Sequence, residues 1–227
     1  KGLGAAATLD GPVVFFWHGA GGSPTEAEFA LGSAAITAIL DAGGIVVAPF
    51  HDPSQTLLPW YLSLGREEND LLVADEILAC AAASIGIDET HIHAVGFSAG
   101  ALHTTQMSFR RASYVASVVT YSGGLTSVRN APPLDAPDAR FAAMMLHGGP
   151  SDVVSVSFQD ATENYLAVVR ANGHFGFICD HGMGHTVPAA ARDSAWAFLE
   201  AHAYGAQPPT YAAGLPSGFY APCALAP

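Results

Sequence analysis

The chain has 227 residues, 50% of them apolar, and carries eight Lys and Arg residues against twenty Asp and Glu residues, which leaves a formal net charge of -12. This length and apolar content suffice for one domain with a substantial core. The acidic balance argues against nucleic acid or an anionic membrane surface as partner, because both attract clustered basic side chains. No apolar run approaches the roughly 20 residues that cross a bilayer, so we expect no membrane span.

The ends of the chain and its cysteines bear on its location. The sequence begins at Lys1 without an initiator Met or a signal-peptide pattern, and we expect a mature protein that is secreted or periplasmic. Cys80 lies in an apolar helical segment, where a buried free thiol is expected. A disulfide between Cys179 and Cys223 would pin the Pro- and Gly-rich end of the chain to the domain and would require an oxidising compartment.

Segments with strand character alternate with segments of helical character along the chain. Strands are predicted at residues 12–17, 44–50, 91–95, 114–121, 141–147 and 174–179, and helices at 24–41, 66–85, 101–111, 155–172 and 188–203. Most of the strands are continuous apolar runs, as in a sheet that helices cover on both faces. The pattern predicts an α/β protein with a mostly parallel, doubly wound sheet. We predict one domain over residues 1–206 and an irregular tail, 207–227, packed on it.

Residues 96–100 read G-x-S-x-G, with Ser98 at the centre. The motif follows the predicted strand 91–95 and precedes the predicted helix 101–111, which is the strand–turn–helix context of a nucleophile elbow. In such an elbow the serine hydroxyl is exposed above the sheet, and the glycines avoid collisions at the tight turn. A small-residue turn where a helix packs closely on a sheet would show the same five residues, so the remaining groups of the site decide between the two readings.

A histidine near the end of the chain would serve as the general base. His185 lies between the last predicted strand and the last predicted helix, after two glycines that allow an unusual backbone path. His181 is the nearest alternative. His91 and His93 lie on or beside the elbow strand and are expected to be packed or hydrogen-bonded structural groups. A metal pair formed by His181 and His185 is disfavoured, because they lie in a loop and not on a helix. We expect no metal and no other cofactor.

A carboxylate would orient that histidine. Asp152 follows the predicted strand 141–147 and is placed to accept the Nδ1–H of His185. An aspartate in such a loop is also a common turn or helix-capping residue, and Asp160 and Asp180 are alternatives. The chain order Ser98, Asp152, His185 is the order expected of α/β-hydrolases.

Backbone donors for an oxyanion are expected from the glycine-rich stretch His18-Gly19-Ala20-Gly21-Gly22, which follows the first strand. We assign the N–H groups of Ala20 and Ala99 to this role. A glycine-rich turn without a ligand is the alternative. A phosphate-binding loop is disfavoured, because the stretch lacks G-x-G-x-x-G and the lysine of a P-loop.

Over residues 12–200 the chain resembles the esterase family that includes polyhydroxybutyrate depolymerases and feruloyl esterases, which are α/β-hydrolases. The residues that carry the resemblance are His18-Gly19 after the first strand, Pro59-Trp60, Gly86-Ile87-Asp88, the GFSAGA run at 96–101, His147-Gly148 with Asp152, and Gly184-His185. The chain departs from the depolymerases at Ala20, where these often carry a cysteine, and in a short segment 52–64. It has no room for a sizeable lid or a substrate-binding domain.

The resemblance implies a serine hydrolase that cleaves carboxylic esters, of small, polyester or feruloyl type, through an acyl-enzyme intermediate. The resemblance also implies that Ser98, Asp152 and His185 form the catalytic triad of the family. We expect Trp60, Phe97 and His18 to contact the substrate, with ordinary core packing as the alternative for Trp60 and Phe97. A monomer that acts on a small or polymeric ester is expected. A peptidase or acyltransferase on the same fold is an alternative, as is a non-catalytic binding module.

Overall fold

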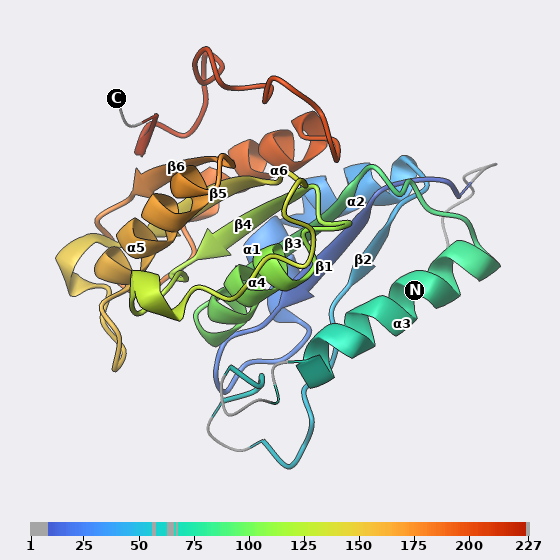
Figure 1. The fold of residues 1–227 in the computed structure, drawn as a ribbon, viewed down its shortest axis with the longest axis horizontal. Helices are drawn as coiled ribbons and strands as arrows, with labels where there is room; N and C mark the ends of the chain where they lie inside the picture. Colours follow the sequence, from blue (N-terminus) through green and yellow to red (C-terminus); the bar gives the residue numbers. More distant parts are fainter. Residues whose placement is uncertain (1–8, 56–57, 63–65, 67, 226–227) are drawn as a thin grey trace.

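The computed structural model describes residues 9–55, 58–62, 66 and 68–225. In this part of the chain one sheet of seven strands has the order β2-β1-β3-β4-β5-β6-β7 (Figure 1). Its strands are β1 Val13–Trp17, β2 Ile45–Val47, β3 Ile92–Phe97, β4 Ser117–Tyr121, β5 Ala142–His147, β6 Phe175–Asp180 and β7 Cys223–Ala224. Neighbouring strands are parallel except for β7, which pairs with β6 in the antiparallel direction. The predicted α/β fold with a mostly parallel sheet is confirmed.

Helices cover both faces of this sheet. They are α1 Glu26–Leu31, α2 Ser33–Asp41, α3 Glu68–Ser84, α4 Ala99–Arg110, α5 Phe158–Ala171 and α6 Arg192–Ala201, with short 3₁₀ turns η1 Val128–Asn130, η2 Gly149–Ser151 and η3 Ala189–Ala191. No described helix combines the length and the apolar character that crossing a bilayer would require.

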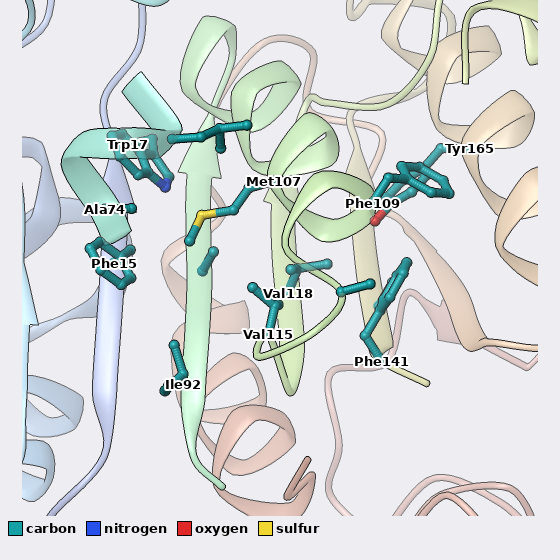
Figure 2. Packing of buried hydrophobic residues seen from close by; sticks show 14 of the residues in the cluster. Phe15, Trp17, Ala74, Ile92, Met107, Phe109, Val115, Val118, Phe141 and Tyr165 are labelled. Atoms are coloured by element: carbon teal, nitrogen blue, oxygen red, sulfur yellow. The ribbon is translucent and has the colours of Figure 1, made fainter. Parts of the chain in front are cut away.

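The period-2 geometry of β1 divides the core into two clusters. Phe15 and Trp17 point to one face, where they pack with apolar residues of α3, α4 and α5, whereas Val14 and Phe16 point to the other face, toward α1, α2 and α6. Figure 2 shows Phe15, Trp17 and Met107 of α4 among the side chains of the first of these clusters. The strand residues are buried on both sides, which explains why the predicted strands read as unbroken apolar runs.

The predicted helix 24–41 is wrong as a single element, because the chain breaks at Gly32. This glycine has φ 81° and ψ 153°, outside the helical region, and separates α1 from α2. Glycine adopts a positive φ without the steric penalty of a Cβ, so it allows a sharp change of direction between the two helices.

The C-terminal tail is not entirely irregular, because Cys223 and Ala224 add β7 to the edge of the sheet. The predicted disulfide is present, with Cys179 of β6 bonded to Cys223. The expectation that Cys80 is buried is wrong. α3 contacts the core through a stripe that includes Leu71, Ala74, Leu78 and Ala81, and Cys80 faces solvent as an exposed free thiol. The domain boundary after residue 206 stays a prediction.

Candidate active site

Ser98 lies in the turn between β3 and α4 and adopts an unusual backbone conformation, with φ 55° and ψ -121°. The two motif glycines permit this turn. A Cβ on Gly96 would lie 2.3 Å from the carbonyl oxygen of Gly100, and one on Gly100 would lie 1.8 Å from that of Trp17. Neither position accepts a side chain unless the backbone shifts. The sequence motif therefore forms the strained elbow that holds a serine side chain at the carboxyl edge of the sheet.

Three side chains that are far apart in sequence meet at this edge. The Oγ of Ser98 lies 2.9 Å from Nε2 of His185, and Nδ1 of His185 lies 2.7 Å from Oδ1 of Asp152. An ionised carboxylate only accepts hydrogen bonds, so Nδ1 carries the imidazole proton and Nε2 accepts from the serine hydroxyl. This tautomer leaves Nε2 free to take a proton from Ser98.

Asp152 is fully buried, and three donors satisfy it. Besides His185, its carboxylate accepts the hydroxyl of Ser122 at 2.8 Å and the N–H of Gly148 at 2.9 Å, both on Oδ2. Burial alone would raise the pKa of Asp152, but the hydrogen bonds from His185, Gly148 and Ser122 outweigh it and hold the pKa below its ordinary value. Asp152 is therefore ionised at neutral pH.

Ser122 was not among the site residues predicted from the sequence. The residue directly follows β4 and has φ 55°. Its N–H donates to the carbonyl of Leu146 in β5, which turns the side chain toward the end of that neighbouring strand. The available signal was a small polar residue at the carboxyl end of an apolar strand, beside the strand that precedes Asp152.

The alternative residues of the sequence analysis lie in other roles. His181 accepts the N–H of Met183 on its own Nδ1 at 3.3 Å. Asp180 is exposed and accepts the N–H of Gly182, and Asp160 lies in the first turn of α5. His93 is fully buried and hydrogen-bonds Ser117. None of these four alternatives joins the hydrogen-bonded chain that Asp152 and His185 form with Ser98.

Two phenylalanines pack on the imidazole of His185. The rings of Phe97 and Phe158 each lie with their centroids 4.9 Å from that of His185, tilted by 31° and 21°. These contacts limit the rotation of the imidazole, so that its two nitrogens stay directed at Ser98 and Asp152. Phe97, expected at the substrate, therefore contacts the histidine directly.

The glycine-rich loop after β1 lies beside the serine. A Cβ on Gly19 would lie 3.4 Å from Cβ of Ser98. The N–H of Gly19 itself donates to Oε2 of Glu26 at 2.9 Å, whereas the N–H of Ala20 has no acceptor among the described residues. Ala99 is the first residue of α4, and the first N–H groups of a helix have no acceptor within that helix. The N–H groups of Ala20 and Ala99 are thus available to a ligand.

His18 and Trp60 support this loop from within the protein instead of lining an open pocket. Their exposed fractions are 0% and 2%. The indole N–H of Trp60 donates to the carbonyl of His18 at 2.8 Å, and the imidazole of His18 lies 3.2 Å from that of His51. Burial is the main cause that lowers the pKa of His18, which is therefore neutral at pH 7. The two side chains were expected to contact the substrate, but both are buried in the structure.

Comparison with known proteins agrees with this architecture. Residues 71–203 match the family model described as phospholipase/carboxylesterase. A search of curated proteins finds no significant match. A solved structure described as native sOPH has 15% identity and a TM-score of 0.71, and the alignment covers 97% of this chain and 87% of that one.

Two further similar structures are described as esterases. A phospholipase/carboxylesterase from Dyadobacter fermentans has 17% identity and a TM-score of 0.65, with 88% of this chain and 94% of that chain covered. A ferulic acid esterase has 16% identity and a TM-score of 0.59, with 84% of each chain covered. At these identities the likeness to solved structures shows the fold, and the family match carries the assignment. The chain belongs to the phospholipase/carboxylesterase family of α/β-hydrolases and is a carboxylic ester hydrolase.

Proposed function

We propose that the protein is a serine esterase in which Ser98, His185 and Asp152 act as a catalytic triad through an acyl-enzyme intermediate. The observation that carries the proposal is the continuous chain of hydrogen bonds from Asp152 through His185 to Ser98, with distances of 2.7 and 2.9 Å. Each member has the partner that its role requires: the nucleophile contacts a base, and a buried carboxylate orients the base.

Acylation follows from this arrangement. As the Oγ of Ser98 attacks the ester carbonyl carbon, its proton passes to Nε2 of His185, and the positive charge on the imidazolium is stabilised by Asp152. The carbonyl oxygen becomes an oxyanion, and the N–H groups of Ala20 and Ala99 donate to it. His185 then gives the proton to the leaving alkoxide, which departs as an alcohol and leaves an acyl group on Ser98.

Deacylation repeats the same proton transfers with water. Nε2 of His185 takes a proton from a water molecule as the water oxygen attacks the acyl carbon. The second oxyanion meets the same two donors, and the proton returns to Oγ of Ser98 when the acid product leaves. Besides the ester and water, the proposed steps use protein side chains and backbone groups.

The substrate class rests on the sequence resemblance. We propose esters of small, polyester or feruloyl type, as expected for relatives of polyhydroxybutyrate depolymerases and feruloyl esterases. We also propose a monomer that works outside the cytoplasm, secreted or periplasmic, since the disulfide between Cys179 and Cys223 suits an oxidising compartment.

The test is hydrolysis of p-nitrophenyl esters graded from acetate to long acyl chains, with Ser98→Ala beside the wild type. We expect kcat to fall by on the order of 10⁶-fold in the variant, since loss of the nucleophile disables the whole triad. Unchanged circular dichroism and melting temperature would show that the variant is folded. Full activity in folded Ser98→Ala would refute the proposal. Added alcohol acceptors in the wild-type reaction would reveal transesterification if the enzyme were an acyltransferase.

A further inference from the structure

A groove lies along α4, the helix that begins immediately after Ser98. Its wall on α4 is formed by Leu102, Gln106 and Arg110, which are four residues apart and therefore share one helix face. The opposite wall comes from the segment that follows β4, residues 124–126 and 129–133, and the cavity volume is about 510 Å³. Figure 1 shows this yellow-green segment passing over α4.

The groove begins close to the nucleophile. The N–H of Leu102 donates to the carbonyl of Ser98 at 3.0 Å, so the first groove residue is one helical turn from the serine. Arg110 stands 12 residues beyond Ser98, which is about 18 Å along the helix at 1.5 Å per residue. A ligand that starts at Ser98 and occupies the groove is therefore an extended chain.

The charge of the groove is opposite to that of the protein. The chain has a net charge of -12 and only one lysine, yet two of its arginines, Arg110 and Arg129, line the groove, and no Asp or Glu does. Arg110 is paired with Glu68 at 2.8 Å. The guanidinium of Arg129 has no acceptor among the described residues, and neither has the side-chain amide of Gln106.

The free side-chain groups of the groove are thus a cation and an amide, in a protein whose net charge of -12 disfavours the approach of anions. The backbone that carries Arg129 is held in η1, because Ser127 accepts its N–H at 3.3 Å. Guanidinium groups bind carboxylates through two parallel hydrogen bonds. An anionic chain whose ester group lies at Ser98 and whose tail occupies this groove gains both the charge and the hydrogen bonds of Arg129.

We propose that the groove binds the chain of an ester that carries a carboxylate, with Arg129 as the group that recognises it. This inference rests on the proposed function, because it assigns the substrate class of the same serine. It distinguishes anionic esters, such as half esters of dicarboxylic acids, from neutral esters of equal size.

The experiment compares matched pairs of esters. On the acyl side, p-nitrophenyl monoesters of succinate, adipate and sebacate are compared with the corresponding methyl p-nitrophenyl diesters. On the alcohol side, acetate esters of ω-hydroxy acids are compared with their methyl esters. We expect wild-type kcat/KM to favour the carboxylate member of the longer pairs on one of the two sides.

Arg129→Gln should lower this carboxylate preference by about fivefold, the upper range for a solvent-accessible ion pair, and 1 M NaCl should lower it in the wild type. Arg140→Gln is the matched control. It makes the same change in net charge, but Arg140 donates to the carbonyls of Pro137 and Ala139, outside the groove. We expect it to keep the wild-type preference.

A wild type that prefers the neutral member of every pair, or equal losses of preference in Arg129→Gln and Arg140→Gln, would overturn the inference while leaving ester hydrolysis intact. Calorimetric binding of the same esters to Ser98→Ala tests recognition without turnover. Ser98→Ala should bind the carboxylate member of a pair more tightly than the neutral member, and adding Arg129→Gln should abolish this difference. That result would support carboxylate recognition in the groove even if the proposed mechanism failed. Equal binding of both members would overturn it.

Discussion

The hydrogen bond between Glu26 and the loop after β1 offers a sharp test of how the oxyanion donors are positioned. Oε2 of Glu26 accepts the N–H of Gly19 at 2.9 Å. The Glu26 carboxylate also packs against Gly22, since a Cβ on this glycine would lie 2.3 Å from Oε1 of Glu26. Because the Gly19 N–H is occupied by Glu26, the loop offers the next N–H, that of Ala20, to a ligand. Removal of Glu26 should let the loop relax and displace the Ala20 donor.

The size of the effect follows from the bond that is lost. A hydrogen bond to a charged group contributes about 1.5–3 kcal/mol, which corresponds to about 10- to 150-fold in rate at about 1.4 kcal/mol per factor of ten. The loss of one complete oxyanion donor, about 10² to 10³-fold in kcat, sets the upper limit. We expect Glu26→Ala to lower kcat within this range. Glu26→Gln keeps an acceptor oxygen without the charge and should lower kcat by less than about tenfold.

The assay separates positioning from substrate binding. If Glu26 acts through the oxyanion donors, kcat falls while KM changes little, because the donors are used mainly in the transition state. Affinity for an alkyl boronic acid, which forms a tetrahedral adduct on the serine, should weaken in parallel with kcat/KM. Glu76→Gln, at an exposed position of α3, is the control for the change in charge.

Three outcomes would refute this reasoning for Glu26. The first is a folded Glu26→Ala with kcat within twofold of the wild type. The second is a raised KM with unchanged kcat. The third is a fall in kcat without any loss of boronate affinity. A melting temperature measured for each variant shows whether the loss of activity reflects unfolding.

Three further changes test the site and the fold. Asp152→Asn should lower kcat about 10⁴-fold by favouring the wrong tautomer of His185. The variant should also be less stable than the wild type, and this difference in unfolding free energy should narrow as the pH falls below 3.8, because the folded-state pKa of Asp152 lies below that ordinary value and the wild-type carboxylate loses its charge in acid. A difference that stays constant down to pH 2 in urea melts would contradict this prediction. Gly100→Ala places a Cβ 1.8 Å from the carbonyl oxygen of Trp17 and should cost about 3 kcal/mol or more, a fall in melting temperature of at least about 6 °C; a stable, active variant would show that the elbow is not tightly packed. Cys223→Ser opens a disulfide between residues 44 apart in sequence and should lower stability by up to about 4 kcal/mol with kcat retained; an unchanged melting temperature under oxidising conditions would contradict the role of the bond.

The fold class and the three residues of the proposed triad could be predicted from the amino-acid sequence. Local signals suffice for these features: apolar runs of strand length, the glycines on either side of Ser98, and the fixed chain order of groups that follow parallel strands. Because parallel strands present their carboxyl ends at one edge, residues that follow β3, β5 and β6 must meet there. The position of Cys223 in a Pro- and Gly-rich end of the chain also suggested its disulfide with Cys179.

The groups that support these residues are visible only in the folded chain. The contact of Ser122 with Asp152 depends on two strands being neighbours, and that of Glu26 with Gly19 depends on how α1 folds back on the loop after β1. Trp60 was predicted to line the pocket because it follows a proline in a loop near the expected cleft, yet its indole N–H donates inward to the carbonyl of His18. Side-chain direction in a loop is set by packing against distant elements, and no local pattern encodes it. The groove along α4 arises for the same reason, because its two walls come from segments that only the folded chain brings together.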